Sequence, residues 1–393
     1  MSRELLKEEN TTVEELLAGA ERVGKLAEQE MVEADQNRTV SKNVVNLIKE
    51  TQISRILLPK KYGGPQVDLK TFAHIIRKVS YHNISAGWLT YLYPLHNSLP
   101  SYLPEKGMDE IATSEGLVVD VFAPVGKAER DGDGYRISGK WHFASGVLHS
   151  EWIGLGVIME MPDGIGPEFC MPIMRTSEVE ILNNWDTFGL RGSGSNSVVV
   201  DNVYVPIERI LRLDKVAVEM KRPPFDHYDK DYPFYHKPFF STFYLGFQNI
   251  ALGGAKRLLK EFKERTEKRI RLDGTPEKES PRSQRVLAEL TMKYKQAELL
   301  VDHYIDLLEN YDENNPTSAE EFFSIRATAI KHCTEIANRI LLTLGGAALS
   351  KGDIVEIMTR DILAVATHIT ALYEDSVADY GKNLFGYETT RNG

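Results

Sequence analysis

Gly139-Lys-Trp-His-Phe-Ala-Ser-Gly146 is the stretch of this sequence that says most about its fold. A second glycine-bearing stretch, Trp185-Asp-Thr-Phe-Gly-Leu-Arg-Gly-Ser-Gly-Ser195, follows it within the clearly β-rich part of the chain. Each combines aromatic rings that can lie against a flat ligand, hydroxyls that can bond its polar edge, and glycines that let backbone amides come close. Together they predict a flavin pocket.

The β-rich part, residues 116–208, separates two helical regions. Its β-branched and aromatic runs, such as residues 117–122 and 197–205, are divided by Asp/Gly turns, which is typical of a small barrel or sandwich. Residues 1–115 show apolar residues at helical spacing. From residue 239 the helical period returns, and three further helices are expected near 283–312, 318–348 and 352–385. Ser318 followed by Glu321 predicts the start of one of them.

Residues 209–238 join the β part to the last helical region. This segment is rich in aromatic residues and proline. A connection of this length in a compact domain is usually functional, so the segment is expected to close over the pocket. Packing against the surface is the plainer alternative.

Composition excludes several classes of protein. The chain has 393 residues, 42% of them hydrophobic, and a net charge of −10, which argues against nucleic acid or an anionic membrane as partner. Only Cys170 and Cys333 are present, without metal-ligand spacing, so neither disulfides nor a metal are expected. No apolar run approaches the ~18 residues of a membrane span, and no signal core precedes the first helix. A cytoplasmic protein is the expectation.

With these motifs in this order, the chain resembles the acyl-CoA dehydrogenase superfamily over nearly its full length. Pro59-Lys-Lys-Tyr-Gly-Gly64 is similar to a Pro-x-x-Tyr-Gly-Gly turn of that family, and Leu344-Gly-Gly346 to its carboxy-terminal flavin-contacting turn. The resemblance implies an α+β fold of the acyl-CoA dehydrogenase type. Its parts are an N-terminal helical domain (1–115), a middle β-barrel domain contacting flavin (116–208), the aromatic loop (209–238) and a C-terminal four-helix bundle (239–393).

Finer details are similar to the two-component flavin monooxygenases within that superfamily. They are Trp-x-Phe-Ala-Ser-Gly at 141–146, Ser-Gly-Ser at 193–195, His96 after Ser85-Ala-Gly-Trp88, and Arg360-Asp361 followed by His368. The resemblance implies an oxygenase that takes reduced FMN or FAD from a separate flavin reductase. With O2 it would form a C4a-hydroperoxide and oxygenate a small aromatic or heteroatom-containing substrate. A homotetramer built from two dimers is also implied.

The resemblance assigns the flavin contacts. Ser145 matches the hydroxyl residue beside flavin N5, and Phe143 matches the aromatic that lies along the ring. The other expected flavin contacts are Ser193, Ser195, Arg269, Arg271, Gly345 and Gly346. In the family the arginines reach the cofactor of a neighbouring subunit. The alternatives are ordinary hairpin chemistry for the serines and a basic helix end for the arginines.

Hydroxylating a phenol requires help in removing its proton, and histidine is the usual side chain for that task near neutral pH. His96 and His368 are the candidates, and which of them acts as the base stays open. Asp361, His368 and Asp375 recur every seven residues, which predicts one helical face on which a carboxylate orients the imidazole. His96, His368 and Asp375 are therefore the expected substrate contacts. Buried structural histidines are the alternative.

Two rival functions remain open at this level. Tyr373-Glu-Asp-Ser376 nearly matches the loop that carries the base of acyl-CoA dehydrogenases, which would make Glu374 the base of a dehydrogenase with bound FAD. The segment 373–376 lacks the glycine of that loop. A flavin-free helical scaffold that keeps the fold without the chemistry is the second rival.

Overall fold

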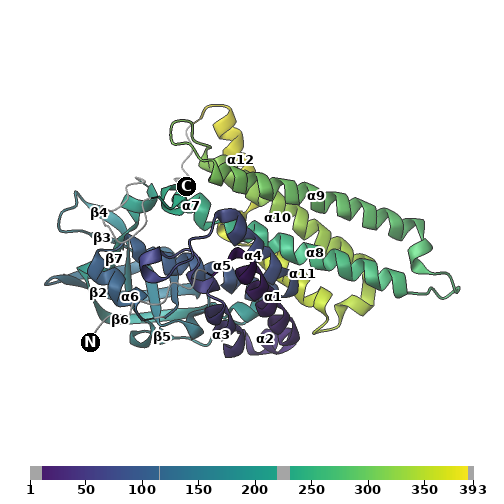
Figure 1. The fold of residues 1–393 in the computed structure, drawn as a ribbon, viewed down its shortest axis with the longest axis horizontal. Coiled ribbons are helices and arrows are strands. Elements are labelled where there is room, and N and C mark those ends of the chain that lie inside the picture. The colour runs from purple at the N-terminus through teal and green to yellow at the C-terminus, as the bar shows by residue number, and fades with distance from the viewer. Residues whose placement is uncertain (1–10, 115, 219–230, 388–393) are drawn as a thin grey trace.

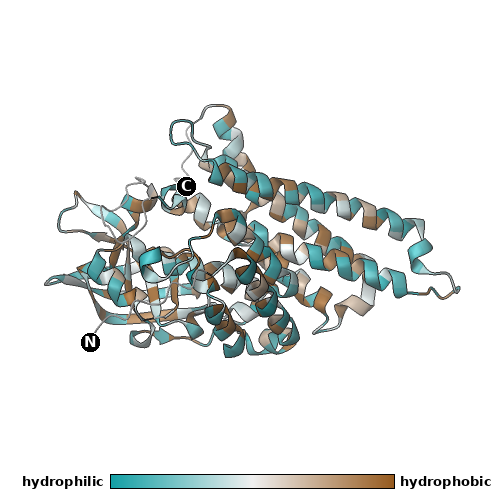
Figure 2. Ribbon diagram, viewed as in Figure 1, coloured by the Kyte–Doolittle hydropathy of each residue, from teal (hydrophilic) through white to brown (hydrophobic). Residues whose placement is uncertain are grey.

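The computed structural model describes residues 11–114, 116–218 and 231–387 of the chain (Figure 1). A β-sheet lies at one end of the elongated molecule. The N-terminal helices lie beside the sheet and in the middle, and the long C-terminal helices extend to the opposite end. Figure 2 shows apolar residues gathered where these three parts meet.

The described N-terminal part contains the α-helices α1 (Val13–Gln29), α2 (Met31–Asn37), α3 (Lys42–Glu50), α4 (Leu69–His82), α5 (Ile84–Ser98) and α6 (Glu105–Ala112), with short 3-10 turns between them. Helix α1 begins at a capping box formed by Thr12 and Glu15. Helix α5 differs from the others because every one of its residues is buried. A helix that is buried all round belongs to the interior, and α5 indeed packs between strand β1 (Val118–Asp131) and helix α8 (Leu245–Lys268).

The middle part is a mixed seven-stranded sheet in the order β5-β6-β2-β1-β3-β4-β7. The strands after β1 are β2 (Gly134–Ala144), β3 (Trp152–Glu160), β4 (Pro167–Arg175), β5 (Glu180–Ile181), β6 (Asn196–Pro206) and β7 (Ile210–Arg212). The long β1 pairs with β3 in parallel through its first half and with β2 antiparallel through its second half. Strands β5 and β7 stand at the two ends of this order, and β1 belongs to both halves of the sheet.

The segment 209–238 is only partly a loop. Strand β7 pairs with β4, and Tyr232, Phe234, Tyr235 and Lys237 are buried. There Tyr232 donates a hydrogen bond to the carbonyl of Val67 over 2.6 Å, and Tyr235 donates to that of Leu57 over 3.0 Å. The two ends of this segment therefore belong to the core. Residues 219–230, the centre of the expected lid, lie outside the described residues.

The C-terminal part contains α7 (Phe239–Phe243), α8, α9 (Pro281–Glu309), α10 (Ala319–Leu344), α11 (Ile354–Ala366) and α12 (Tyr373–Leu384). The expected start of α10 is confirmed, because the Ser318 side chain accepts a hydrogen bond from the Glu321 N–H over 3.1 Å. The prediction of a single helix over 352–385 is wrong. It is divided where His368 adopts extended backbone angles and caps a short 3-10 turn with its own side chain. None of the described helices is long and apolar enough to cross a membrane.

Candidate functional site

Ser145 follows β2 directly, and its hydroxyl belongs to a buried series of hydrogen bonds. Trp88 of α5 donates its Nε1–H to Ser145 Oγ over 3.1 Å. Ser145 Oγ lies 2.7 Å from Ser195 Oγ, which lies 2.7 Å from Ser193 Oγ, and Ser193 donates to the Leu190 carbonyl over 2.7 Å. We call Ser145, Ser195 and Ser193 the serine chain. It brings the two glycine-bearing stretches together.

Phe143 lies beside the serine chain and faces outward. Its side chain is 69% exposed in the single chain, and its ring meets that of Trp185 edge to face at 6.1 Å. Its backbone has φ of 69°, a left-handed conformation that is uncommon for an aromatic residue. Strained backbone is often found at ligand sites. The geometry suits a ring that stacks on a flat ligand, which stays a prediction.

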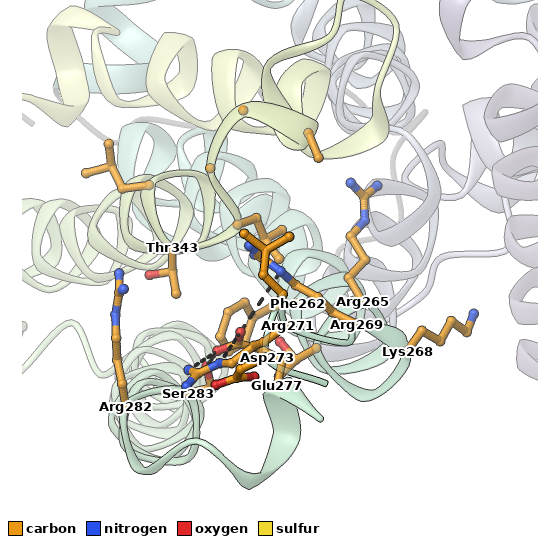
Figure 3. A pocket seen from close by; sticks show the side chains of 17 residues that line it. Phe262, Arg265, Lys268, Arg269, Arg271, Asp273, Glu277, Arg282, Ser283 and Thr343 are labelled. Carbon is orange, nitrogen blue, oxygen red and sulfur yellow. Dashed lines mark hydrogen bonds and ion pairs between the residues drawn. The ribbon is translucent and has the colours of Figure 1, made fainter. Parts of the chain in front are cut away.

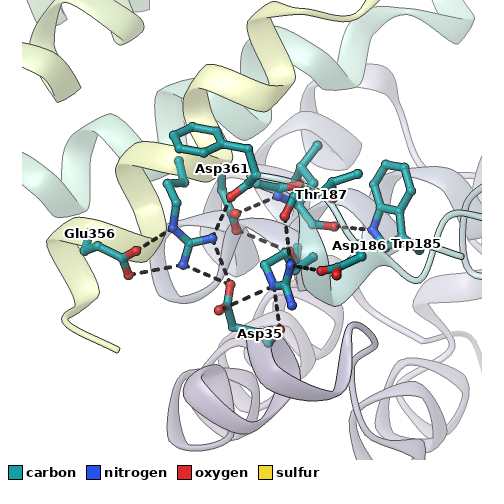
Figure 4. Close-up of polar contacts among 12 residues, drawn as sticks. Asp35, Trp185, Asp186, Thr187, Glu356 and Asp361 are labelled. Carbon is teal, nitrogen blue, oxygen red and sulfur yellow. Dashed lines mark hydrogen bonds and ion pairs between the residues drawn. The ribbon is translucent and has the colours of Figure 1, made fainter. Parts of the chain in front are cut away.

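Side chains from two helices hold the loop that carries Ser193 and Ser195. Arg360 of α11 bonds Glu356 over 2.6 Å, Asp35 of α2 over 3.0 Å and the Phe188 carbonyl over 2.8 Å. Arg191 of the loop bonds Asp186 over 2.6 Å and the Asp35 carbonyl over 2.8 Å. Figure 4 shows this network between the helices and the loop. Residues 183–195 form no strand, so these contacts fix the loop.

Asp361 is the buried member of this network. Its Oδ1 accepts a hydrogen bond from the Leu190 N–H over 2.7 Å, and its Oδ2 accepts one from Ser85 Oγ over 3.2 Å. Burial raises the pKa of Asp361 to about 7. The expectation that Asp361, His368 and Asp375 share one helical face is wrong, because α11 ends at Ala366. Asp361 therefore positions the loop that carries the serine chain.

The raised pKa of Asp361 predicts a pH-dependent stability. Between pH ~4 and ~7 the folded protein keeps a proton here that the unfolded chain has lost. The stabilisation is therefore complete below pH ~4 and is lost as the pH rises through ~7, at up to ~1.4 kcal/mol per pH unit. Asp361→Asn should remove this contribution. Urea unfolding at pH 5, 6, 7 and 8 should show the wild type losing stability relative to the variant, and parallel curves would contradict the assignment.

His96, also on α5, is buried against a carboxylate. Its Nε2 lies 3.2 Å from Asp120 Oδ2 of β1. Burial lowers the pKa of His96 to about 3 and raises the pKa of Asp120 well above its usual range. Burial therefore favours the neutral form of each group. The Nδ1 atom of His96 has no hydrogen-bond partner among the described residues.

His368 lies half-buried in an aromatic environment. Its ring stacks on Phe247 at 4.4 Å and lies 6.1 Å from the ring of Trp88. Its Nδ1 accepts a hydrogen bond from the Thr370 N–H over 3.3 Å, which leaves the hydrogen of the neutral ring on Nε2. Burial first, and the charge of Arg326 second, lower the pKa of His368 to about 4. At neutral pH the ring therefore offers an Nε2–H donor.

Helix α5 carries His96 and, through Trp88, contacts the other two predicted catalytic residues. Trp88 contacts both Ser145 and His368, and His96 lies two turns further along the same helix. The sequence interpretation gave no role to Trp88 or Asp120. Asp120 is a lone carboxylate inside an apolar strand, and this feature of the sequence could have indicated a site residue. Asp375 and Glu374 are both exposed at the start of α12.

The predicted contacts Arg269, Arg271, Gly345 and Gly346 line a separate pocket of about 1110 Å³. Figure 3 shows the basic side chains that surround it. Arg271 bonds Glu277 through two nitrogens at 2.9 Å and lowers the pKa of that carboxyl to about 2. This basic pocket lies at the far end of α8 and α10, at the opposite end of the molecule from the sheet (Figure 1). One chain therefore does not bring these residues to Ser145.

Side chains of metal-ligating type do not gather in the parts of the chain that the structure describes: no three His, Cys, Asp or Glu residues form such a group there.

The chain is similar to known proteins over most of its length. Residues 245–372 match the family model "Acyl-CoA dehydrogenase, C-terminal domain". The oxygenase component of p-hydroxyphenylacetate 3-hydroxylase from Acinetobacter baumannii is 27% identical, with 90% of this chain and 85% of that protein covered. A pigment production hydroxylase from Rhodococcus erythropolis is 25% identical, with 94% and 93% covered.

Solved structures show the same fold. The 3-HSA hydroxylase from Rhodococcus sp. RHA1 superimposes with a TM-score of 0.86 at 22% identity, covering 96% of this chain and 98% of that one. XiaF from Streptomyces sp., solved in complex with FADH2 and glycerol, gives a TM-score of 0.85 at 21% identity, covering 96% and 97%. The chain thus matches an acyl-CoA dehydrogenase C-terminal domain over residues 245–372, and the relatives that it resembles include flavin-dependent monooxygenases.

Proposed function

We propose that this protein is an oxygenase component that uses reduced FMN or FAD, supplied by a separate flavin reductase, to oxygenate a small aromatic or heteroatom-containing substrate. The observation that carries the proposal is the buried Ser145 hydroxyl beside the outward-facing ring of Phe143. The similarity to oxygenase components supports it. The dehydrogenase alternative is disfavoured, because its base Glu374 is exposed at the start of α12.

The residues present fit a flavin. A bound reduced flavin supplies two electrons for the activation of O2. Phe143 would lie along its ring system, Ser145 would hold the N5 edge, and the buried loop at 190–195 would exclude water from that edge. Asp361 of α11 accepts from the Leu190 N–H and Arg360 of α11 donates to the Phe188 carbonyl, so the loop is held in place before the ligand arrives.

The substrate would lie against the aromatic side chains near α5 and α8. Trp88, Tyr91 and Phe247 contact one another there, with His368 at their edge. The Nε2–H of His368 would donate to an oxygen of the substrate, and His96 would contact it through Nδ1. Because burial lowers the pKa of both histidines, we expect hydrogen-bonding roles in the free protein. Transfer of a phenol proton to either ring would create a charged imidazolium, which burial disfavours at both histidines.

The basic pocket would receive the phosphate or pyrophosphate of a flavin bound to a neighbouring subunit. Arginine and lysine are suited to phosphate, and Arg265, Lys268, Arg269, Arg271 and Arg282 line this pocket together. Its distance from Ser145 within one chain requires a second copy of the chain to complete the site. A homotetramer provides such copies.

The test is anaerobic titration with reduced FMN and FAD, followed by mixing with O2 in the presence of phenols, thiophenes or amines. The expected result is binding of reduced flavin and formation of an oxygenated product. Replacing Arg269 and Arg271 together by methionine should weaken flavin binding although both residues are remote from Ser145. Absence of flavin binding by the wild type would overturn the proposal in favour of a flavin-free scaffold, and bleaching of bound oxidised FAD by acyl-CoA would favour the dehydrogenase.

A further inference from the structure

The direction of every hydrogen bond in the serine chain follows from counting hydrogens. A serine hydroxyl carries one hydrogen and two lone pairs. Ser193 donates its only hydrogen to the Leu190 carbonyl, so Ser195 must be the donor in its bond to Ser193. Ser195 then has no hydrogen left for Ser145, and Ser145 must be the donor in the bond between them. The Ser145 hydrogen is thereby directed away from the ligand.

One lone pair of Ser145 Oγ remains. Trp88 occupies the other through its Nε1–H, so all donors and acceptors of this hydroxyl except one are used within the protein. A ligand atom beside Ser145 can therefore donate a hydrogen bond to it but cannot accept one from it. Reduced flavin carries a hydrogen at N5, whereas N5 of oxidised flavin is a bare acceptor.

Leu190, which accepts the last hydrogen bond of the serine chain, is held firmly. The Leu190 carbonyl also accepts a hydrogen bond from Trp185 Nε1 over 3.0 Å, and its N–H is bound to Asp361. Ser193 and Ser195 are 1% and 4% exposed, so water cannot readily replace one partner and reverse the direction. The Leu190 carbonyl would keep the hydrogen bonds from the Ser193 N–H and Trp185 Nε1, but a reversal would set a lone pair of Ser193 Oγ against that carbonyl oxygen at 2.7 Å, which is repulsive.

We infer that Ser195 and Ser193 are positioning residues that make Ser145 Oγ a hydrogen-bond acceptor, so that the site distinguishes reduced from oxidised flavin at N5. The inference rests on the proposed function, because it requires the flavin to lie beside Ser145. If the serines only satisfied one another's buried hydroxyls, their loss would affect the two oxidation states equally. The two roles are therefore separable by measurement.

The test compares the dissociation constants of oxidised and reduced flavin for the wild type and Ser195→Ala. In the variant the Ser145 hydrogen can turn toward a bare N5, so the ratio of the oxidised to the reduced constant should fall about tenfold, the value of one hydrogen bond. The midpoint potential of the bound flavin should fall by about 30 mV. Ser193→Ala should act in the same direction, because it removes the acceptor of Ser195.

Ser197→Ala is the matched control. Ser197 is a buried serine on β6 that bonds His142 and Asn184 and lies outside the serine chain. The ratio of the oxidised-flavin to the reduced-flavin dissociation constant in this variant should therefore equal that of the wild type. An unchanged ratio in both Ser195→Ala and Ser193→Ala, with flavin still bound, would overturn the inference. If one of these variants does not fold, the other decides. Failure of the wild type to bind either flavin would overturn the proposed function instead.

Discussion

Ser145→Ala should shorten by about 10²-fold the delay between mixing the reduced, flavin-loaded protein with O2 and the return of oxidised-flavin absorbance. The factor is that found for removing one preorganised hydrogen-bonding group from an active site. Ser145 would be the only side chain of the serine chain that faces N5, so alanine leaves that edge without a partner. Stopped-flow absorbance measures the delay, and peroxide release measures the oxygen that fails to reach substrate.

This variant also tests the buried hydrogen bonds. Alanine leaves the Nε1–H of Trp88 without an acceptor and removes the hydrogen that Ser195 Oγ accepts, which should lower the free energy of unfolding by ~1–3 kcal/mol. Ser197→Ala again serves as the control, with a delay like that of the wild type. If the delay in Ser145→Ala equals that of the control, Ser145 does not face the reacting flavin.

Gly189→Ala should be the most damaging small substitution in the loop that carries Ser193 and Ser195. A Cβ at this position would lie 2.2 Å from the carbonyl oxygen of Arg360 on α11. Because the obstacle is helix backbone, the loop must move, and the bond from Leu190 to Asp361 is lost with it. Overpacking and an unpaired buried group together should cost ~2–5 kcal/mol. Denaturant unfolding and flavin titration measure the two consequences.

Gly381→Ala provides the comparison for a glycine without a close neighbour. This residue lies within α12, and apart from its chain neighbours and the backbone of its own helix no atom lies within 4 Å of a Cβ built there. Alanine is favoured over glycine inside a helix by ~0.5–1 kcal/mol, so this variant should equal or exceed the wild type in stability. Equal stabilities for the two alanine variants would show that the loop tolerates displacement from α11.

Local sequence determined the elements of this protein and the residue types of its site. The cap at Ser318, the long C-terminal helical patterns and the glycine-bearing stretches around Ser145 and Ser195 depend on neighbours close in sequence. Their signals could therefore be recognised directly, and the family resemblance then gave the fold and the flavin chemistry.

Only the tertiary structure decided which side chains meet. Periodicity placed Asp361 and His368 on one helix, but the capping of the turn by His368 ends that helix, and Asp361 instead binds Leu190 far away in sequence. The pairing of His96 with Asp120 and the order of the serine chain likewise depend on contacts between α5, β1 and the loop at 190–195. Burial, which shifts the pKa values of these groups, is a property of the packed molecule and has no counterpart in a local sequence pattern.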